Sequence, residues 1–292
     1  MIETCGTRIH ADISGEGRPP VVFEAGIAAT SLSWRLVQPE IARTAQTVSY
    51  DRAGLGWSGK PSNSRIVWAL IDELRAMLDH AGVPAPRVLV AHSFGGLIAL
   101  GYAKRFPAEV AGLVLVDPIT RGDVHLGMLR RGIFLARLGE LLARFGVVRM
   151  ALALVAGGSQ RVPRLIARAS SGRRGAAFTE RMAGEIRKLP REIWPAIQSH
   201  WCDPKCFRAM RNHLEALPQS AQSVFDEAVS LDVPLIVLSA VNATPAKRAE
   251  HERIARSSSR GRLEIVEESG HWIMLDRPDV VIREIANMVA NG

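Results

Sequence analysis

Two kinds of segment alternate along most of the chain. Short runs of β-branched and other apolar residues predict buried strands at residues 7–13, 21–24, 47–50, 88–90, 113–116, 234–238 and 263–266. Apolar residues recur at helical spacing over residues 65–80, and further helices are expected from 97 to about 102, near 246–255 and over 278–289. This alternation is typical of a mostly parallel sheet flanked by crossover helices. The pattern therefore predicts an α/β fold.

Residues 119–232 interrupt the alternation. Their apolar pattern is helical and is broken repeatedly by glycine and proline, and strands resume only at 234. A single interruption of one sheet domain is the economical interpretation. We therefore expect a core domain formed by residues 1–118 and 233–292, with a helical cap, or lid, of residues 119–232 inserted into it.

The composition is that of a globular protein. Of 292 residues, 47% are hydrophobic and 23% are charged, which is enough for one large core with an inserted lobe. The first residues show no secretory signal pattern, and no window offers the roughly 18 uninterrupted apolar residues of a membrane span. Three cysteines are too few for a disulfide scaffold. These features predict a cytoplasmic protein.

The net charge of +8 is concentrated in the cap segment. Residues 119–232 hold 18 Lys and Arg against 10 Asp and Glu, whereas the rest of the chain holds 19 of each sign. A basic lobe attracts anionic substrates and is compatible with weak association with an anionic membrane surface. No nucleic-acid partner is expected, because the lobe lacks any recognisable nucleic-acid-binding motif.

A serine stands between a predicted strand and a predicted helix in the run Ala-His-Ser-Phe-Gly-Gly of residues 91–96. A nucleophile on so sharp a turn needs small residues two positions before and after it, and these are Ala91 and Gly95. The amides at the start of the following helix can stabilise a developing oxyanion. The spacing alone is common in glycine-rich chains, but the strand before and the helix after favour Ser93 as a nucleophile.

Three segments resemble the α/β-hydrolase superfamily, in its esterase-like serine hydrolase branch with a helical lid after the sixth strand. They are residues 91–96, the loop of residues 50–58, and Ser-Gly-His-Trp at 269–272. The resemblance implies an α/β-hydrolase fold with a mostly parallel sheet and an inserted cap. Ala91 departs from the family, which usually has glycine there, but alanine is still small.

The resemblance implies that His271 is the base that accepts the serine proton. It lies on a loop between the last predicted strand and the terminal helix, at the sheet edge where Ser93 also lies. His92 is next to the nucleophile in sequence, and we expect it to point to the other side and serve packing.

Two loops offer positions for the acid that orients His271. The commonest family position follows the strand of residues 234–238, but the loop 239–244 contains Asn242 and no carboxylate. Asp117 ends the preceding strand, where some branches of the family carry their acid, so it is the favoured candidate. A strand-end aspartate can also merely cap backbone. Asp51 and Asp276 are weaker candidates, the first in a structural turn and the second at a helix start.

Two backbone amides are expected to form the oxyanion hole. One is that of Phe94, directly after the nucleophile. The second would come from Ile27, which follows Gly26 in the loop after the strand of residues 21–24. The family often has His-Gly in that loop, but the donor is backbone, so the missing histidine does not abolish it.

The first part of the cap predicts a long helix over about residues 127–156. Arg130, Arg137 and Arg144 recur every seven residues and form one narrow stripe, which leaves a wide apolar face. We favour a lid helix that buries this face against the core domain, although an element that touches lipid or an acyl chain fits the same pattern. Histidines and cysteines at 200–213 loosely suggest metal ligands, but their spacing is not that of a zinc site.

These observations predict a serine hydrolase without metal or other cofactor, which cleaves carboxylic esters of a small-molecule acyl substrate. Ser93 argues against the dehalogenases and epoxide hydrolases of the superfamily, which use an aspartate nucleophile. Thioesters, lactones and carbon–carbon bonds stay open as substrates, because the same machinery serves them. A non-catalytic protein that keeps the fold as a ligand pocket is the remaining alternative, since the loop at Asn242 lacks an acid.

Overall fold

The computed structural model describes residues 1–150, 187–227 and 230–291. Among these residues the main sheet has seven strands in the order β3-β5-β4-β6-β7-β8-β9, and all neighbours are parallel except β3 and β5. The α/β fold predicted from the sequence is therefore correct. The strands are β3 Ala11–Ser14, β4 Val21–Glu24, β5 Thr47–Tyr50, β6 Arg87–His92, β7 Val110–Val116, β8 Leu235–Ala240 and β9 Gly261–Val266.

The single strand expected at residues 7–13 is wrong, because the chain breaks at His10. The first half is β2 (Thr7–Ile9), which pairs with β1 (Ile2–Thr4) in a separate hairpin, and the second half is β3. The backbone of His10 bonds the loop after β5 instead: its N–H donates to Ser58 Oγ (2.8 Å) and its carbonyl accepts from the Asp51 N–H (2.9 Å).

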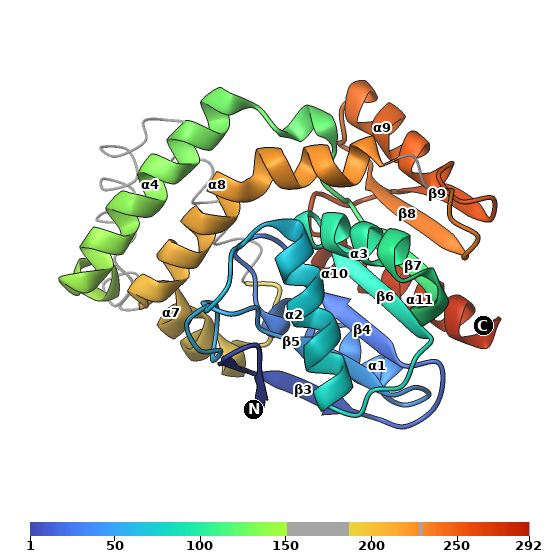
Figure 1. Ribbon diagram of the computed structural model, residues 1–292, viewed down its shortest axis with the longest axis horizontal. Coiled ribbons are helices and arrows are strands. Elements are labelled where there is room, and N and C mark those ends of the chain that lie inside the picture. The colour runs from blue at the N-terminus through green and yellow to red at the C-terminus, as the bar shows by residue number, and fades with distance from the viewer. Residues whose placement is uncertain (151–186, 228–229, 292) are drawn as a thin grey trace.

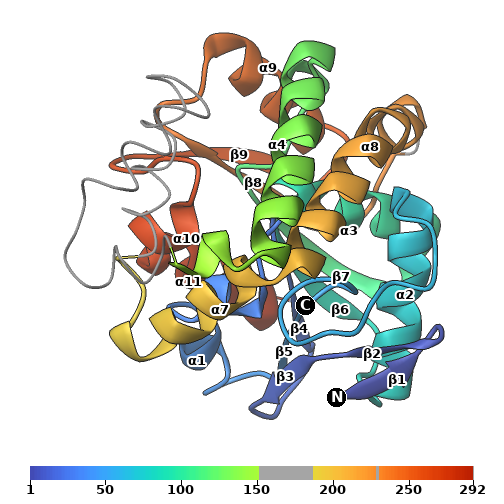
Figure 2. The ribbon, with the colours of Figure 1, turned by 90° about the vertical axis from the view of Figure 1, so that its left-hand side faces the viewer.

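Helices cover both faces of the sheet (Figure 2). Helices α2 (Val67–His80) and α3 (Phe94–Arg105) lie on one face, and α1 (Gln38–Ile41) and α11 (Pro278–Ala290) lie on the other. Central strands are buried on both sides, with alternate residues entering the two apolar clusters, as the two-residue period of a strand requires. The remaining helices of the core are α9 (Pro245–Ala255) and α10 (Ile273–Asp276).

Three described helices between β7 and β8 lie over one side of the sheet domain (Figure 1). They are α4 (Leu126–Arg144), α7 (Trp194–Cys202) and α8 (Pro204–Asp226). Helices α4 and α8 run side by side in both views, and the buried carboxylate of Glu140 joins them by accepting from Arg208 (2.8 Å) and Arg211 (3.3 Å). No helix in the described ranges is long and apolar enough to span a membrane.

The buried face of α4 is narrower than the sequence pattern predicts. Its inward positions include Ala136 and Ala143, whose small side chains allow a close approach to α8. Phe134 (62% exposed) and Leu141 (50%) instead share the outer face with Arg137. The expectation that the apolar face of this helix is buried is therefore wrong for Phe134 and Leu141, although Leu129 is buried. The predicted continuation of one helix beyond Arg144 is wrong, because α4 ends there and a turn at Phe145 and Gly146 follows, with Gly146 at φ +72°. The predicted stretch of residues 151–156 lies outside the described residues.

Candidate active site

Ser93 occupies a sharp turn between β6 and α3. Its backbone has φ +54° and ψ −117°, a conformation that side chains rarely adopt, and its N–H donates to the Val116 carbonyl (3.1 Å). A Cβ added at Gly95 would lie 2.6 Å from the Glu24 carbonyl oxygen and 2.7 Å from that of Ala25. The small residue expected two positions after the serine is therefore required by the backbone of β4 and its loop.

We expect Gly95→Ala to destabilise the protein by about 1–3 kcal/mol, because the new methyl group meets rigid backbone on two sides. Differential scanning calorimetry would show this as a melting temperature several degrees lower. Gly127→Ala is the matched control, since Gly127 lies on a helix and an added Cβ there meets nothing within 4 Å. Equal melting temperatures for the two variants would contradict the steric account.

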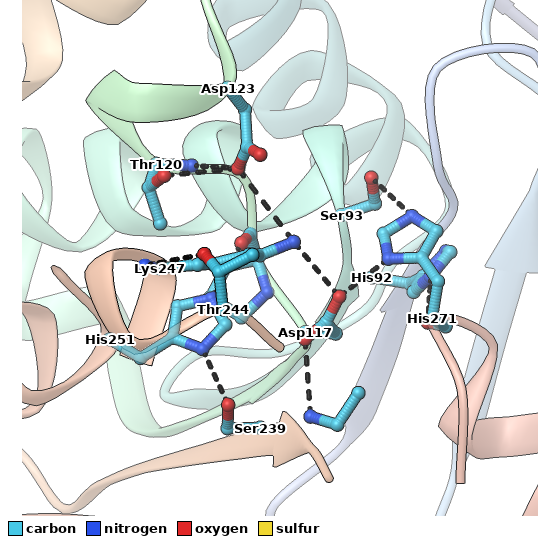
Figure 3. Close-up of polar contacts among 12 residues, drawn as sticks. His92, Ser93, Asp117, Thr120, Asp123, Ser239, Thr244, Lys247, His251 and His271 are labelled. Atoms are coloured by element: carbon cyan, nitrogen blue, oxygen red, sulfur yellow. Dashed lines mark hydrogen bonds and ion pairs between the residues drawn. The ribbon is translucent and has the colours of Figure 1, made fainter. Parts of the chain in front are cut away.

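His271 lies between Ser93 and Asp117 (Figure 3). Its Nδ1 is 2.6 Å from Asp117 Oδ2, and its Nε2 is 3.1 Å from Ser93 Oγ. The loop that carries it after β9 is anchored by a hydrogen bond from the Gly270 N–H to Asp276 Oδ2 (2.7 Å). Residues far apart in sequence thus form one chain of hydrogen bonds at the carboxyl edge of the sheet.

Asp117 is a buried, ionised carboxylate at the end of β7. Its Oδ1 accepts from the Ala240 N–H (3.2 Å), and its Oδ2 lies 3.0 Å from Lys247 Nζ as well as against His271. Burial opposes the charged form, but the hydrogen bond from His271 and the charge of Lys247 outweigh it and hold the pKa of Asp117 well below its ordinary value. The carboxylate is therefore available to stabilise a protonated His271.

Asn242 does not take part in this chain. Its side chain is exposed and makes no hydrogen bond with any residue that the structure describes. The loop after β8 contributes the Ala240 N–H to Asp117 instead of an acid of its own. The carboxylate that contacts His271 thus comes from the strand before, as the sequence analysis favoured.

The two weaker acid candidates have local contacts of their own. Asp51 accepts from the N–H groups of Ser31 (2.8 Å) and Trp57 (2.9 Å), so it shapes the loop after β5. Asp276 lies at the end of α10 rather than at a helix start, where it forms an ion pair with Lys188 and holds the His271 loop. Neither carboxylate hydrogen-bonds the His271 ring.

His92 is buried, as expected, but it does not point away from the base. Its Nε2 lies 2.9 Å from the His271 carbonyl oxygen, and the two rings are 4.6 Å apart between centroids. Burial and the neighbouring His271 lower the pKa of His92 to about 3, so it is neutral. It therefore packs directly beneath the base and donates to its backbone.

The amides of Ile27 and Phe94 are both free. Neither N–H donates a hydrogen bond to another residue in the described part of the chain. The Ile27 loop is held by Arg52, which pairs with buried Glu24 and donates to the Ala25 carbonyl (2.7 Å). Sequence reasoning missed this pair. The one sequence feature that indicates the pair is Glu24 at the end of a buried strand, because a buried carboxylate needs a cationic partner.

Two histidines of α7 and α8 meet the core domain at separate points. The His213 ring lies 5.4 Å from that of Phe94, and the His200 ring lies 4.4 Å from that of Trp57. Burial and the nearby charge of Arg52 hold the pKa of His213 well below its ordinary value. The described residues contain no cluster of His, Cys, Asp and Glu that could hold a metal ion.

Known proteins resemble this chain in sequence or in fold. The chain is 35% identical to cis-3-alkyl-4-alkyloxetan-2-one decarboxylase of Shewanella oneidensis over 124 residues, which is 41% of this chain but only 38% of that protein. The structure of the epoxide hydrolase CorEH aligns with a TM-score of 0.73 at 19% identity, covering 100% of this chain and 97% of that one. A thermophilic esterase from Thermogutta terrifontis aligns with a TM-score of 0.69, also at 19% identity, covering 99% and 96%.

The family comparison spans almost the whole chain. Residues 21–284 match the model of the alpha/beta hydrolase family, a range that begins at β4 and ends within α11. The sheet order and the turn at Ser93 agree with that match. The chain therefore belongs to the alpha/beta hydrolase family.

Proposed function

We propose that this protein is a serine hydrolase that cleaves carboxylic esters through Ser93, His271 and Asp117. The observation that carries the proposal is the continuous hydrogen-bonded chain from Asp117 Oδ2 through the imidazole to Ser93 Oγ. A serine hydroxyl is a weak nucleophile unless an adjacent base takes its proton, and this arrangement supplies both the base and the group that orients it.

In the first half of the reaction, Ser93 Oγ attacks the ester carbonyl while His271 Nε2 accepts its proton. The ionised Asp117 stabilises the imidazolium and fixes Nδ1 as the donor toward it. The amides of Ile27 and Phe94 receive the oxyanion of the tetrahedral intermediate. His271 then returns the proton to the leaving alcohol, and an acyl group stays on Ser93.

In the second half, water replaces the alcohol. His271 removes a proton from the water, the hydroxide attacks the acyl carbonyl, and the same amides hold the new oxyanion. Collapse of this intermediate transfers the proton back to Ser93 and releases the carboxylic acid. No step needs a metal or another cofactor.

The relatives' names cover more than one chemistry, since they include a decarboxylase of an oxetan-2-one and an esterase. Each of these substrates, and equally a thioester or a lactone, presents an electrophilic centre to the same nucleophile. Carboxylic esters are the simplest class of substrate whose cleavage uses every group of the site, and we therefore propose esters as the substrates. A ligand-binding protein without turnover is the contrasting alternative.

A substrate panel tests the proposal. We expect turnover of p-nitrophenyl esters of graded acyl length, with an optimum that reports the acyl pocket. Thioester, lactone and vinylogous diketone substrates in the same assay would identify a different bond if they are preferred by more than about tenfold, which is about 1.4 kcal/mol of transition-state discrimination. Absence of turnover on every member would favour the binding protein.

The exposed face of α4 bears on the second predicted partner, an anionic membrane surface. Phe134 and Leu141 lie on that face with exposed Arg130 and with Arg137, which also pairs with Glu215 of α8 (3.1 Å). The face thus combines apolar and cationic side chains, as interfacial helices do. We propose weak association through this face. Cosedimentation with phosphatidylglycerol vesicles, but not with phosphatidylcholine vesicles, is the expected result, and equal recovery with both would contradict it.

A further inference from the structure

Lys247 forms an ion pair with the acid of the candidate triad. Its Nζ lies 3.0 Å from Asp117 Oδ2, the same oxygen that contacts His271 Nδ1. Its side chain is only 18% exposed, and Asp117 is nearly inaccessible. Figure 3 shows the ammonium group of Lys247 and the imidazole of His271 approaching the same oxygen of Asp117 from different sides. One carboxylate oxygen is therefore shared between the lysine ammonium group and the imidazole.

The position of Lys247 on its helix is unfavourable by itself. Thr244 caps α9 by accepting from the Lys247 N–H (3.2 Å), which places this lysine in the first helical turn. The partial positive charge of a helix N-terminus disfavours a cation there. The ion pair with Asp117, supported by Asp123 Oδ2 at 3.7 Å, offsets this cost.

We propose that Lys247 is a positioning residue that, through Asp117, sets the pH range in which His271 acts as a base. The inference rests on the proposed function. A cation beside the shared oxygen offsets part of the negative charge of Asp117 and repels a positive charge on the imidazole. It therefore destabilises the protonated form of the His271 ring relative to the neutral form. Removing the charge of Lys247 should therefore shift the pH range over which Ser93 reacts.

Other charged and titratable groups around His271 do not supply this effect. His92 packs against the ring but is neutral, because burial lowers its pKa to about 3. His251 on α9 is buried between Ser239 Oγ and the Pro118 carbonyl, and burial lowers its pKa too. Asp276 accepts from the Gly270 N–H in the His271 loop and forms an ion pair with Lys188, and neither side chain hydrogen-bonds Asp117 or the His271 ring in the described part of the chain. Lys247 is the cation that contacts the carboxylate directly.

The rate of inactivation by a fluorophosphonate, measured from pH 4 to 10, tests the inference without knowledge of the natural substrate. We expect Lys247→Met to move the acid limb of the profile up by about one pH unit, while the plateau at high pH changes less than about threefold. Lys247→Gln keeps a hydrogen bond to Asp117 without the charge, so it should move the limb by a similar amount. Lys247→Arg restores the charge and should leave the limb in place.

Arg253→Met is the matched control, because Arg253 lies on the same helix, is 66% exposed and pairs only with Glu250 among the described residues. Its profile should equal that of the wild type. The inference would be overturned if Lys247→Met and Lys247→Gln both lowered the inactivation rate at high pH and left the acid limb of the profile in place. That result would mean that Lys247 has a structural role only. Absence of labelling in the wild type would instead contradict the proposed function.

Discussion

Replacing Ser93 by alanine is expected to lower kcat by about 10⁵- to 10⁶-fold on any substrate that the wild-type protein turns over. No other hydroxyl in the described residues hydrogen-bonds the His271 ring, so nothing nearby can replace the nucleophile. Water attack within the oxyanion hole would account for the residual rate. Steady-state hydrolysis of the best ester from the panel measures the effect.

Ser239→Ala is the matched control for this loss. Ser239 is also buried at the carboxyl end of a parallel strand, but its Oγ contacts His251 Nδ1 (2.9 Å) and not the His271 ring. The variant should keep most of its activity. A loss in Ser239→Ala comparable to that in Ser93→Ala would show that general disruption of this sheet edge, and not the nucleophile, explains the result.

Asp117→Asn is expected to lower kcat by about 10³- to 10⁴-fold. An amide in this buried position cannot stabilise the imidazolium, and its NH₂ group can donate to Nδ1, which fixes the wrong tautomer of His271. The residue also holds Ala240 and Lys247, so circular dichroism and a melting curve must accompany the kinetics.

Asn242→Ala separates the two possible positions of the acid. Asn242 lies on the loop where the family commonly carries its acid, but it is exposed and has no hydrogen bond within the described residues. We expect activity within about twofold of the wild type, as for surface substitutions. If Asn242→Ala lost more activity than Asp117→Asn, the assignment of the acid to β7 would be wrong.

The sheet was predictable because its strands are local patterns. Buried parallel strands appear as short continuous apolar runs, and the run of residues 88–90 before Ser93 did become part of β6. The run of residues 7–13 shows the limit of this reasoning. A strand pattern does not show which strand each half of a segment will pair with. Here the contacts of His10 with the loop after β5 divide residues 7–13 between two sheets.

The candidate site was predictable as far as its residues follow strand ends. Ser93, Asp117 and His271 each come directly after a strand or its turn, and parallel strands bring such ends to one edge. Lys247 could not be found in this way, because it is 130 residues from Asp117 and lies within a polar helix whose surface has many charges. The prediction that His92 points away from the base was wrong for a related reason. The orientation of its side chain depends on the packing of the distant His271 loop.

The central claim is that Ser93 is a nucleophile activated by His271. Its most direct test is mass spectrometry of the peptide that contains Ser93 after reaction with a fluorophosphonate. We expect a phosphonyl adduct on Ser93 in the wild-type protein, no adduct in Ser93→Ala, and labelling slowed by several orders of magnitude in His271→Ala. An unmodified Ser93 in folded wild-type protein, or equal labelling of wild type and His271→Ala, would contradict the account.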